Sequence, residues 1–66
     1  MKNKIKELRK ERRISQEELA KAVHVTRQTI ISLESEKCNA SLLLAHAIAQ
    51  YFGKTIEEIF IFEEEE

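Results

Sequence analysis

The 66-residue sequence has no proline and a single cysteine, Cys38. One cysteine cannot form a disulfide within the chain, which is the usage expected in a reducing compartment. No apolar run approaches the roughly 20 residues that a membrane-spanning helix needs, and no apolar segment follows the basic N-terminus as it would in a signal peptide. We therefore expect a cytoplasmic protein with no membrane partner.

The sequence contains a single glycine, Gly53. Neither a linker nor an internal repeat is visible. The composition is 42% apolar and 35% charged, which is typical of a soluble globular chain rather than a disordered one. This length suits one domain, so we take residues 1–66 as a single unit. A core of this size contributes little stability, and self-association would add to it.

Charge is unevenly distributed, although the net charge is only −1. Residues 1–37 hold ten Lys or Arg and six Glu, whereas residues 38–66 hold one Lys and six Glu. A chain with a basic half can meet DNA through that half. The alternative is that Lys and Glu decorate the helices for solubility, and composition does not choose between the two.

Capping signals predict an all-α domain of five short helices. Ser15 with Glu18 and Thr55 with Glu58 have the spacing of capping boxes, in which a hydroxyl and a carboxylate each accept a backbone N–H. Gly53 is suited to end a helix in the left-handed conformation. Together with apolar spacing, these signals predict helices at about residues 2–12, 15–22, 26–35, 41–53 and 55–60. The predicted core face of the fourth helix is Leu42, Ala45, Ile48, Ala49 and Phe52.

The third predicted helix has two different faces. At about 100° per residue, Ile30 and Leu33 fall on one side and face the core. The other side carries polar groups and one apolar residue: Arg27, Gln28, Ile31, Ser32 and Ser35. The chain breaks before this helix, so its first turn can project, and amide and guanidinium groups there could read base edges in a major groove. The alternative is an ordinary solvated face.

Two stretches resemble a known family. "LRKERRISQEELAKAVHVTRQTIISLESEK" resembles the helix-turn-helix of the Cro/cI, or xenobiotic-response-element, family of phage-repressor type, and "SLLLAHAIAQYFGKTIEEIF" is similar to its last two helices. The resemblance covers about residues 3–60. It implies a compact five-helix, lambda-repressor-like fold, with residues 15–35 as the helix-turn-helix core and residues 61–66 as a C-terminal tail.

The resemblance also implies roles for individual residues. Gln16, at the start of the second helix, would contact a DNA phosphate, and Ser35 and Lys37 would meet the backbone beyond the third helix. The residues facing the groove would be Thr26, Arg27, Gln28, Ile31 and Ser32. Arg9 and Glu34 match a salt bridge that ties the first helix to the third.

The sequence departs from the family pattern at four places. His24 and Arg13 stand where glycine is common, and Ala40 stands where proline is common, so we expect these to affect the backbone. We predict a positive φ at His24, a residue type that tolerates it better than most. "ESEK" replaces the usual "ENGK", so Ser35 takes the place of an asparagine and Glu36 adds a charge that DNA repels. We expect this last change to affect phosphate affinity rather than the fold.

Other kinds of site are poorly indicated. His24, Cys38 and His46 fit no usual zinc spacing. No nucleophile motif surrounds any Ser, His or Glu, and a core this small leaves little room for a substrate pocket. We expect no enzymatic activity, no metal, no cofactor and no small-molecule effector.

Apolar residues in excess of what a small core can bury predict a dimer surface. They are Leu43, Ala47, Tyr51, Ile59, Phe60, Ile61 and Phe62. A two-fold dimer would bury them and set two third helices about 34 Å apart, one turn of DNA. Residues 59–62 can pair as a short C-terminal strand with the mate or with the N-terminus, and the four glutamates at 63–66 would stop further edge growth. The alternative is that Phe60 and Phe62 fold back onto their own helices.

These observations lead to one functional prediction. We expect a sequence-specific transcriptional regulator, a repressor that binds double-stranded DNA at a pseudo-palindromic operator as a homodimer. The alternative is a helix-turn-helix module used mainly for protein–protein interaction.

Overall fold

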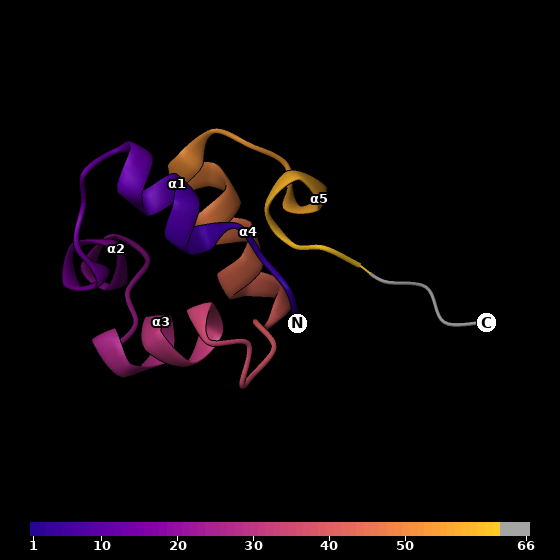
Figure 1. Cartoon of the computed structure of the whole chain (residues 1–66), viewed down its shortest axis with the longest axis horizontal. Coiled ribbons are helices and arrows are strands. Elements are labelled where there is room, and N and C mark those ends of the chain that lie inside the picture. Colours follow the sequence, from indigo (N-terminus) through magenta and orange to yellow (C-terminus); the bar gives the residue numbers. More distant parts are fainter. Residues whose placement is uncertain (63–66) are drawn as a thin grey trace.

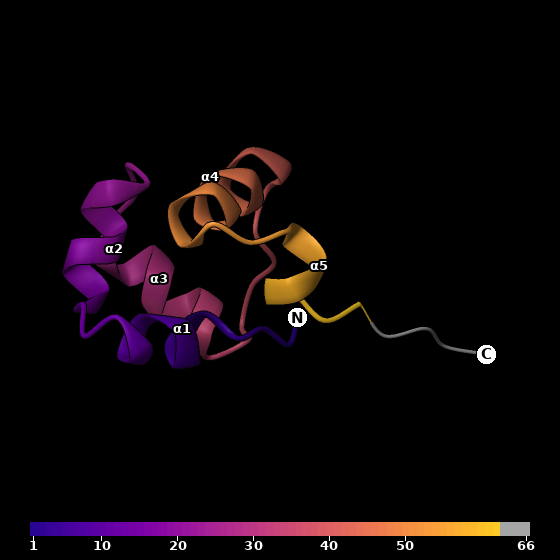
Figure 2. The ribbon, with the colours of Figure 1, turned by 90° about the horizontal axis from the view of Figure 1, so that it is seen from above.

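The computed structural model describes residues 1–62, and within that range it is all-helical apart from one isolated β-bridge. The helices are α1 (Ile5–Glu11), α2 (Gln16–Ala22), α3 (Arg27–Glu34), α4 (Leu42–Phe52) and α5 (Ile56–Ile59). α2 and α3 lie toward one end of the molecule and α5 toward the other (Figure 1). α1 and α4 lie on opposite sides (Figure 2). The predicted five-helix, all-α class is confirmed, whereas the prediction for the four glutamates at 63–66 lies outside the described residues.

The helices begin where their capping chemistry places them. Ser15 Oγ accepts from the Glu18 N–H at 3.0 Å while Glu18 Oε1 accepts from the Ser15 N–H at 3.0 Å. Thr55 and Glu58 form a second reciprocal pair, at 2.8 and 3.2 Å. The hydrogen bond from the Thr55 N–H lowers the pKa of Glu58 below its ordinary value. Both capping boxes are therefore formed as predicted, because each depends only on residues three positions apart.

Residues 2–4 pair with residues 59–61, which shortens the first helix. The Lys4 N–H donates to the Ile59 carbonyl at 2.8 Å, the Ile61 N–H donates to the Lys2 carbonyl at 2.9 Å, and Asn3 pairs with Phe60 in an antiparallel bridge. Residues 2–4 are thus held beside residues 59–61, and α1 starts at Ile5 rather than near residue 2. The predicted pairing of the C-terminal segment with the N-terminus occurs as this bridge and not as a strand.

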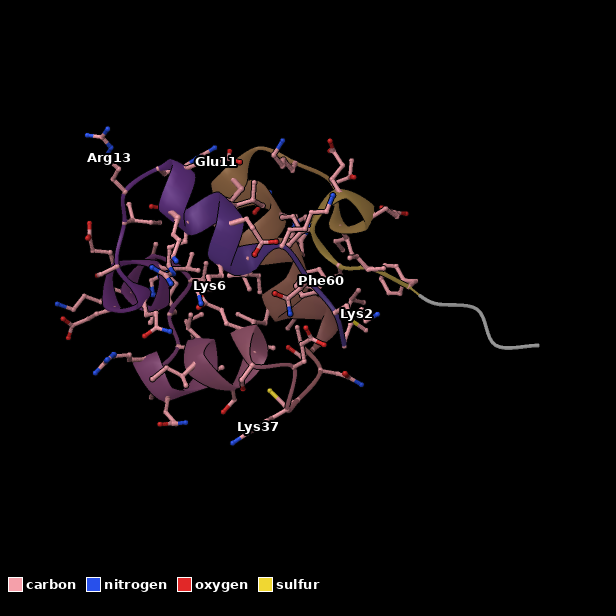
Figure 3. All side chains as sticks on the ribbon, in the orientation of Figure 1. Lys2, Lys6, Glu11, Arg13, Lys37 and Phe60 are labelled. Atoms are coloured by element: carbon pink, nitrogen blue, oxygen red, sulfur yellow. The ribbon has the colours of Figure 1, made fainter. Side chains whose placement is uncertain are left out.

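The core gathers one face of every helix. Its fully buried large side chains are Ile5, Leu19, Ile30, Leu33, Ile48, Ile59 and Phe60. The expectation that Ile59 and Phe60 lie exposed is therefore wrong, because the pairing of the chain ends brings both inward; Phe60 lies inside the molecule beside α4 (Figure 3). Leu42 was predicted in the core but is 78% exposed. It is the first residue of α4, where no other described element covers it.

Four turns use a left-handed residue to end a helix, and only one of them has glycine. Gly53 has φ 66°, and the other three are Arg13 (φ 57°), His24 (φ 61°) and Glu36 (φ 65°). In each turn the next N–H donates to a carbonyl five residues earlier, at 2.9–3.1 Å. The prediction for His24 is confirmed. Glu36, expected to act on phosphate affinity rather than on the fold, also adopts this left-handed backbone conformation.

These turns give a stability prediction. His24→Gly is expected to raise the free energy of unfolding by about 0.5–1 kcal/mol, since glycine has no Cβ to clash in the left-handed conformation. Thermal unfolding followed by circular dichroism measures the change. Lys21→Gly, in the last turn of α2, is the control and should destabilise, because glycine is a poor helix former. A lower melting temperature for His24→Gly would contradict the geometry.

Candidate nucleic-acid interface

The exposed face of α3 carries most of the residues predicted to face a groove. Arg27 and Gln28 are exposed in its first turn, and Ile31 and Ser32 are half-buried one turn later. Gln28 Nε2 lies 3.4 Å from Ser32 Oγ, so these two side chains share one patch. A guanidinium, an amide and a hydroxyl are thereby grouped on one side of a helix, opposite its buried Ile30.

Two predicted contact residues use their hydroxyls locally. Thr26 caps α3, with its Oγ1 accepting from the Thr29 N–H at 3.2 Å. Ser35 Oγ donates to the Ser32 carbonyl at 3.1 Å, so it is turned back onto the helix. Lys37 is exposed in the loop beyond α3 and points outward (Figure 3). Of the backbone contacts predicted at this end, the lysine is the one whose polar group faces away from the protein.

Arg9 and Glu34 form the expected ion pair between α1 and α3. Arg9 Nε lies 2.8 Å from Glu34 Oε2 and Arg9 Nη2 lies 3.2 Å from Oε1, a bidentate arrangement. The side chains are only 12% and 6% exposed, and Arg9 Nη1 also donates to the Ile14 carbonyl at 3.0 Å. The hydrogen bond to Glu34 raises the pKa of Arg9, so this guanidinium stays charged.

Gln16 joins this pair, which the sequence did not reveal. Its Nε2 donates to Glu34 Oε1 at 3.2 Å across 18 residues of sequence. Gln16 also lines a surface depression of about 500 Å³, together with Arg9, Ser15, Glu17 and Arg27. Gln16, expected at a phosphate, and Arg27, expected in the groove, therefore border the same depression. Glu17 is the one acidic residue that lines it.

Asn3 also contacts the C-terminal end of α3, beside Glu34, and the sequence did not indicate this contact. Its Nδ2 donates to the Leu33 carbonyl at 2.8 Å, and its Oδ1 accepts from the Ile5 N–H at 3.2 Å. One side chain thus starts α1 and satisfies a carbonyl at the end of α3. The local signal, an asparagine two residues before a helix, was available, but its partner 30 residues away was not.

Arg12 was also missed, and it contacts the C-terminal end of α4. Its Nη1 and Nη2 donate to the carbonyls of Tyr51 and Phe52 at 3.0 and 2.7 Å. Its guanidinium carbon lies 5.2 Å from the Phe52 ring centre. Arg12 therefore caps the C-terminal end of α4 and is a scaffold residue rather than a ligand-facing one.

The residues predicted at a dimer surface are divided by the fold. Leu43, Ile61 and Phe62 are exposed, with Leu43 at 82%. Ala47 and Tyr51 are half-buried against the core. Ile59 and Phe60 are buried in the core of their own chain and are not available as a surface. A nearby groove of about 230 Å³ is lined only by apolar residues: Met1, Ala40, Leu42, Ala45, Ile56, Phe60 and Phe62.

Residues 1–62 provide neither a metal-binding cluster nor a membrane-spanning helix. No three His, Cys, Asp or Glu side chains lie close enough together there to hold a metal ion, and Cys38 is exposed. In the same range no helix is long and apolar enough to cross a bilayer.

Comparison with known proteins bears on this surface. A helix-turn-helix family model matches residues 5–59, so the resemblance seen in the sequence is confirmed. An uncharacterized HTH-type transcriptional regulator of Archaeoglobus fulgidus is 54% identical over 66 residues, covering 100% of this chain and 93% of its own. One from Methanocaldococcus jannaschii is 52% identical and covers 100% of both chains. The regulator YgzD of Bacillus subtilis is 48% identical over 65 residues and covers 98% of both.

The Arg9–Glu34 pair gives a second prediction. Arg9→Ala or Glu34→Ala is expected to lower the free energy of unfolding by about 1–3 kcal/mol, because each leaves a largely buried charge without its partner. The double variant should lose less than the sum of the single losses. Urea unfolding of all four proteins completes the cycle. Strictly additive losses would mean that the two side chains do not interact.

Proposed function

The chain belongs to the helix-turn-helix family of transcriptional regulators, and we propose that it is a sequence-specific repressor that binds a pseudo-palindromic operator as a homodimer. The family is a DNA-binding, non-enzymatic class. The observation that carries the proposal is the grouping of exposed polar side chains at the start of α3, next to the Gln16 depression.

Base reading is assigned to the exposed side of α3. A major groove of about 12 Å admits a helix, and an amide such as that of Gln28 suits the N6 and N7 of adenine. Arg27 can take a guanine or a phosphate, because guanidinium donors suit both. Ile31, half-buried beside Ser32, offers its exposed carbons to a thymine methyl group.

Backbone contacts are assigned to the two ends of this surface. Gln16 has amide N–H groups beside the depression, and Lys37 carries an exposed positive charge beyond α3. Contacts of this kind add affinity without sequence preference and weaken as salt rises. Glu36 lies beside Lys37 in sequence and opposes phosphate binding, so this end is expected to contribute less than Gln16.

The dimer is assigned to the start of α4 and the C-terminal segment. Residues 38–53 contain no Lys, Arg, Asp or Glu, although 35% of the whole chain is charged. Within this stretch Leu42 and Leu43 are 78% and 82% exposed, and Leu42 borders the apolar groove beside Phe62. Depletion of charge around exposed apolar side chains is typical of an interface core, and a second copy of the chain supplies a matching apolar face.

Selective base reading can be tested at Gln28. Gln28→Ala should cost about 1–3 kcal/mol of binding free energy on a duplex selected from a random library, and little on unselected duplex, because only base contacts distinguish the two. Gln50→Ala removes an exposed amide from α4 and should leave the preference unchanged. Fluorescence anisotropy measures all three proteins. Equal losses on both duplexes would contradict base reading, and no binding to either by the unmodified protein would favour a protein–protein module.

The dimer surface can be tested at Leu43. Leu43→Ser should weaken dimerisation at least about tenfold, since two copies each lose an apolar side chain worth roughly 1.5–3 kcal/mol when buried. The melting temperature of the monomer should change little, because this side chain is exposed within one chain. Sedimentation velocity at tens of micromolar distinguishes the states, with Lys54→Ser as the control. A monomeric unmodified protein at that concentration would contradict the dimer.

A further inference from the structure

One carboxylate joins three helices at the edge of the surface described above. Glu34, on α3, accepts from Arg9 Nε on Oε2 at 2.8 Å, and its Oε1 accepts from both Arg9 Nη2 and Gln16 Nε2 at 3.2 Å. Arg9 comes from α1 and Gln16 is the first residue of α2. Glu34 therefore does more than close an ion pair, because the same oxygen that holds the arginine also holds the amide.

This arrangement fixes which end of the Gln16 amide faces the hollow. One N–H of Nε2 is directed to Glu34, so the amide cannot rotate freely about its last bond without losing that hydrogen bond. The second N–H is on the same Nε2 atom, and the Gln16 side chain borders the depression of about 500 Å³. A phosphate oxygen only accepts hydrogen bonds, so an N–H held at this rim is the group that it requires.

The ion pair also removes an electrostatic objection. A carboxylate beside DNA would ordinarily repel the phosphates. Glu34 is only 6% exposed and is matched by a bidentate guanidinium, so the cluster presents a paired charge and a donor rather than an open anion. Because Arg9 neutralises Glu34, this carboxylate can hold the Gln16 amide without repelling DNA.

We propose that Glu34 is a positioning residue for the DNA backbone: it orients the Gln16 amide so that its second N–H meets a phosphate oxygen in the depression between α1, α2 and α3. The inference rests on the DNA binding proposed above. It gives Glu34 a role in affinity in addition to its role in stability.

For Glu34→Gln, a positioning role and net charge predict opposite changes in DNA affinity. Glu34→Gln removes one negative charge near DNA, which by electrostatics alone should strengthen binding to any duplex. A glutamine, however, cannot accept all three N–H groups, because its own NH₂ would face a donor. We therefore expect Glu34→Gln to weaken binding to random duplex DNA by roughly fivefold to tenfold, the loss of about one hydrogen bond.

A matched control and a double variant complete the experiment. Glu58→Gln makes the same change of charge and chemistry in a fully exposed capping box on α5, and it should leave binding unchanged or slightly tighter. Gln16→Ala should weaken binding as much as Glu34→Gln does. In the Gln16→Ala background, Glu34→Gln should have less than about a twofold further effect. Anisotropy titrations at about 50 and 200 mM salt, corrected for the folded fraction by circular dichroism, measure all five proteins.

The outcomes separate this inference from the proposed function. If the unmodified protein binds no random DNA at either salt concentration, DNA binding and this inference are both overturned. If it binds and Gln16→Ala weakens it, but Glu34→Gln is neutral, tighter, or equally harmful in both backgrounds, only the positioning role is overturned. Weaker binding by Glu34→Gln that disappears in the Gln16→Ala background supports the role, since a purely structural defect would not depend on Gln16.

Discussion

The bidentate ion pair between Arg9 and Glu34 is the interaction on which the arrangement of the proposed DNA-facing side depends. Burying two charges is costly, and here the cost is offset by short contacts at 2.8 and 3.2 Å and by the Ile14 carbonyl, which takes the third guanidinium N–H. Because Gln16 shares the same carboxylate, α1, α2 and α3 meet at one point. Asn3 holds the same C-terminal end of α3 through the Leu33 carbonyl. The C-terminal end of α3 is thus fixed by contacts from α1, from α2 and from the N-terminal segment.

Features that depend on neighbouring residues could be predicted from the sequence. The capping boxes at Ser15 and Thr55 were found because their partners lie three residues away, and the end of α4 was found from Gly53. Features that depend on distant residues could not. The late start of α1 and the burial of Phe60 both follow from the pairing of residues 2–4 with residues 59–61, and the sequence indicated the N-terminus as only one of two partners for that segment. Leu42 has the right spacing for the core but projects beyond it.

The candidate site was predictable to a different degree. The polar face of α3 followed from helical spacing, whereas the Arg9–Glu34 pair followed only from family resemblance, since its members are 25 residues apart. Neither source indicated the hydrogen bond from Gln16 to Glu34. The positive φ of Glu36 was overlooked because the substitution was interpreted only through the charge of the glutamate. Apart from Gly53, the left-handed turns of this chain are built without glycine, so the usual sequence signal for them is missing.

The claim that one face, formed by α2, α3 and the loop after α3, meets DNA is tested most directly by nuclear magnetic resonance. The ¹⁵N-labelled protein is titrated with a short random duplex, and amide shifts are followed residue by residue. The account predicts the largest changes at residues 15–16, 26–32 and 35–37, including the side-chain amide of Gln16, with α5 almost unaffected. Changes confined to the start of α4 and residues 61–62 would contradict it.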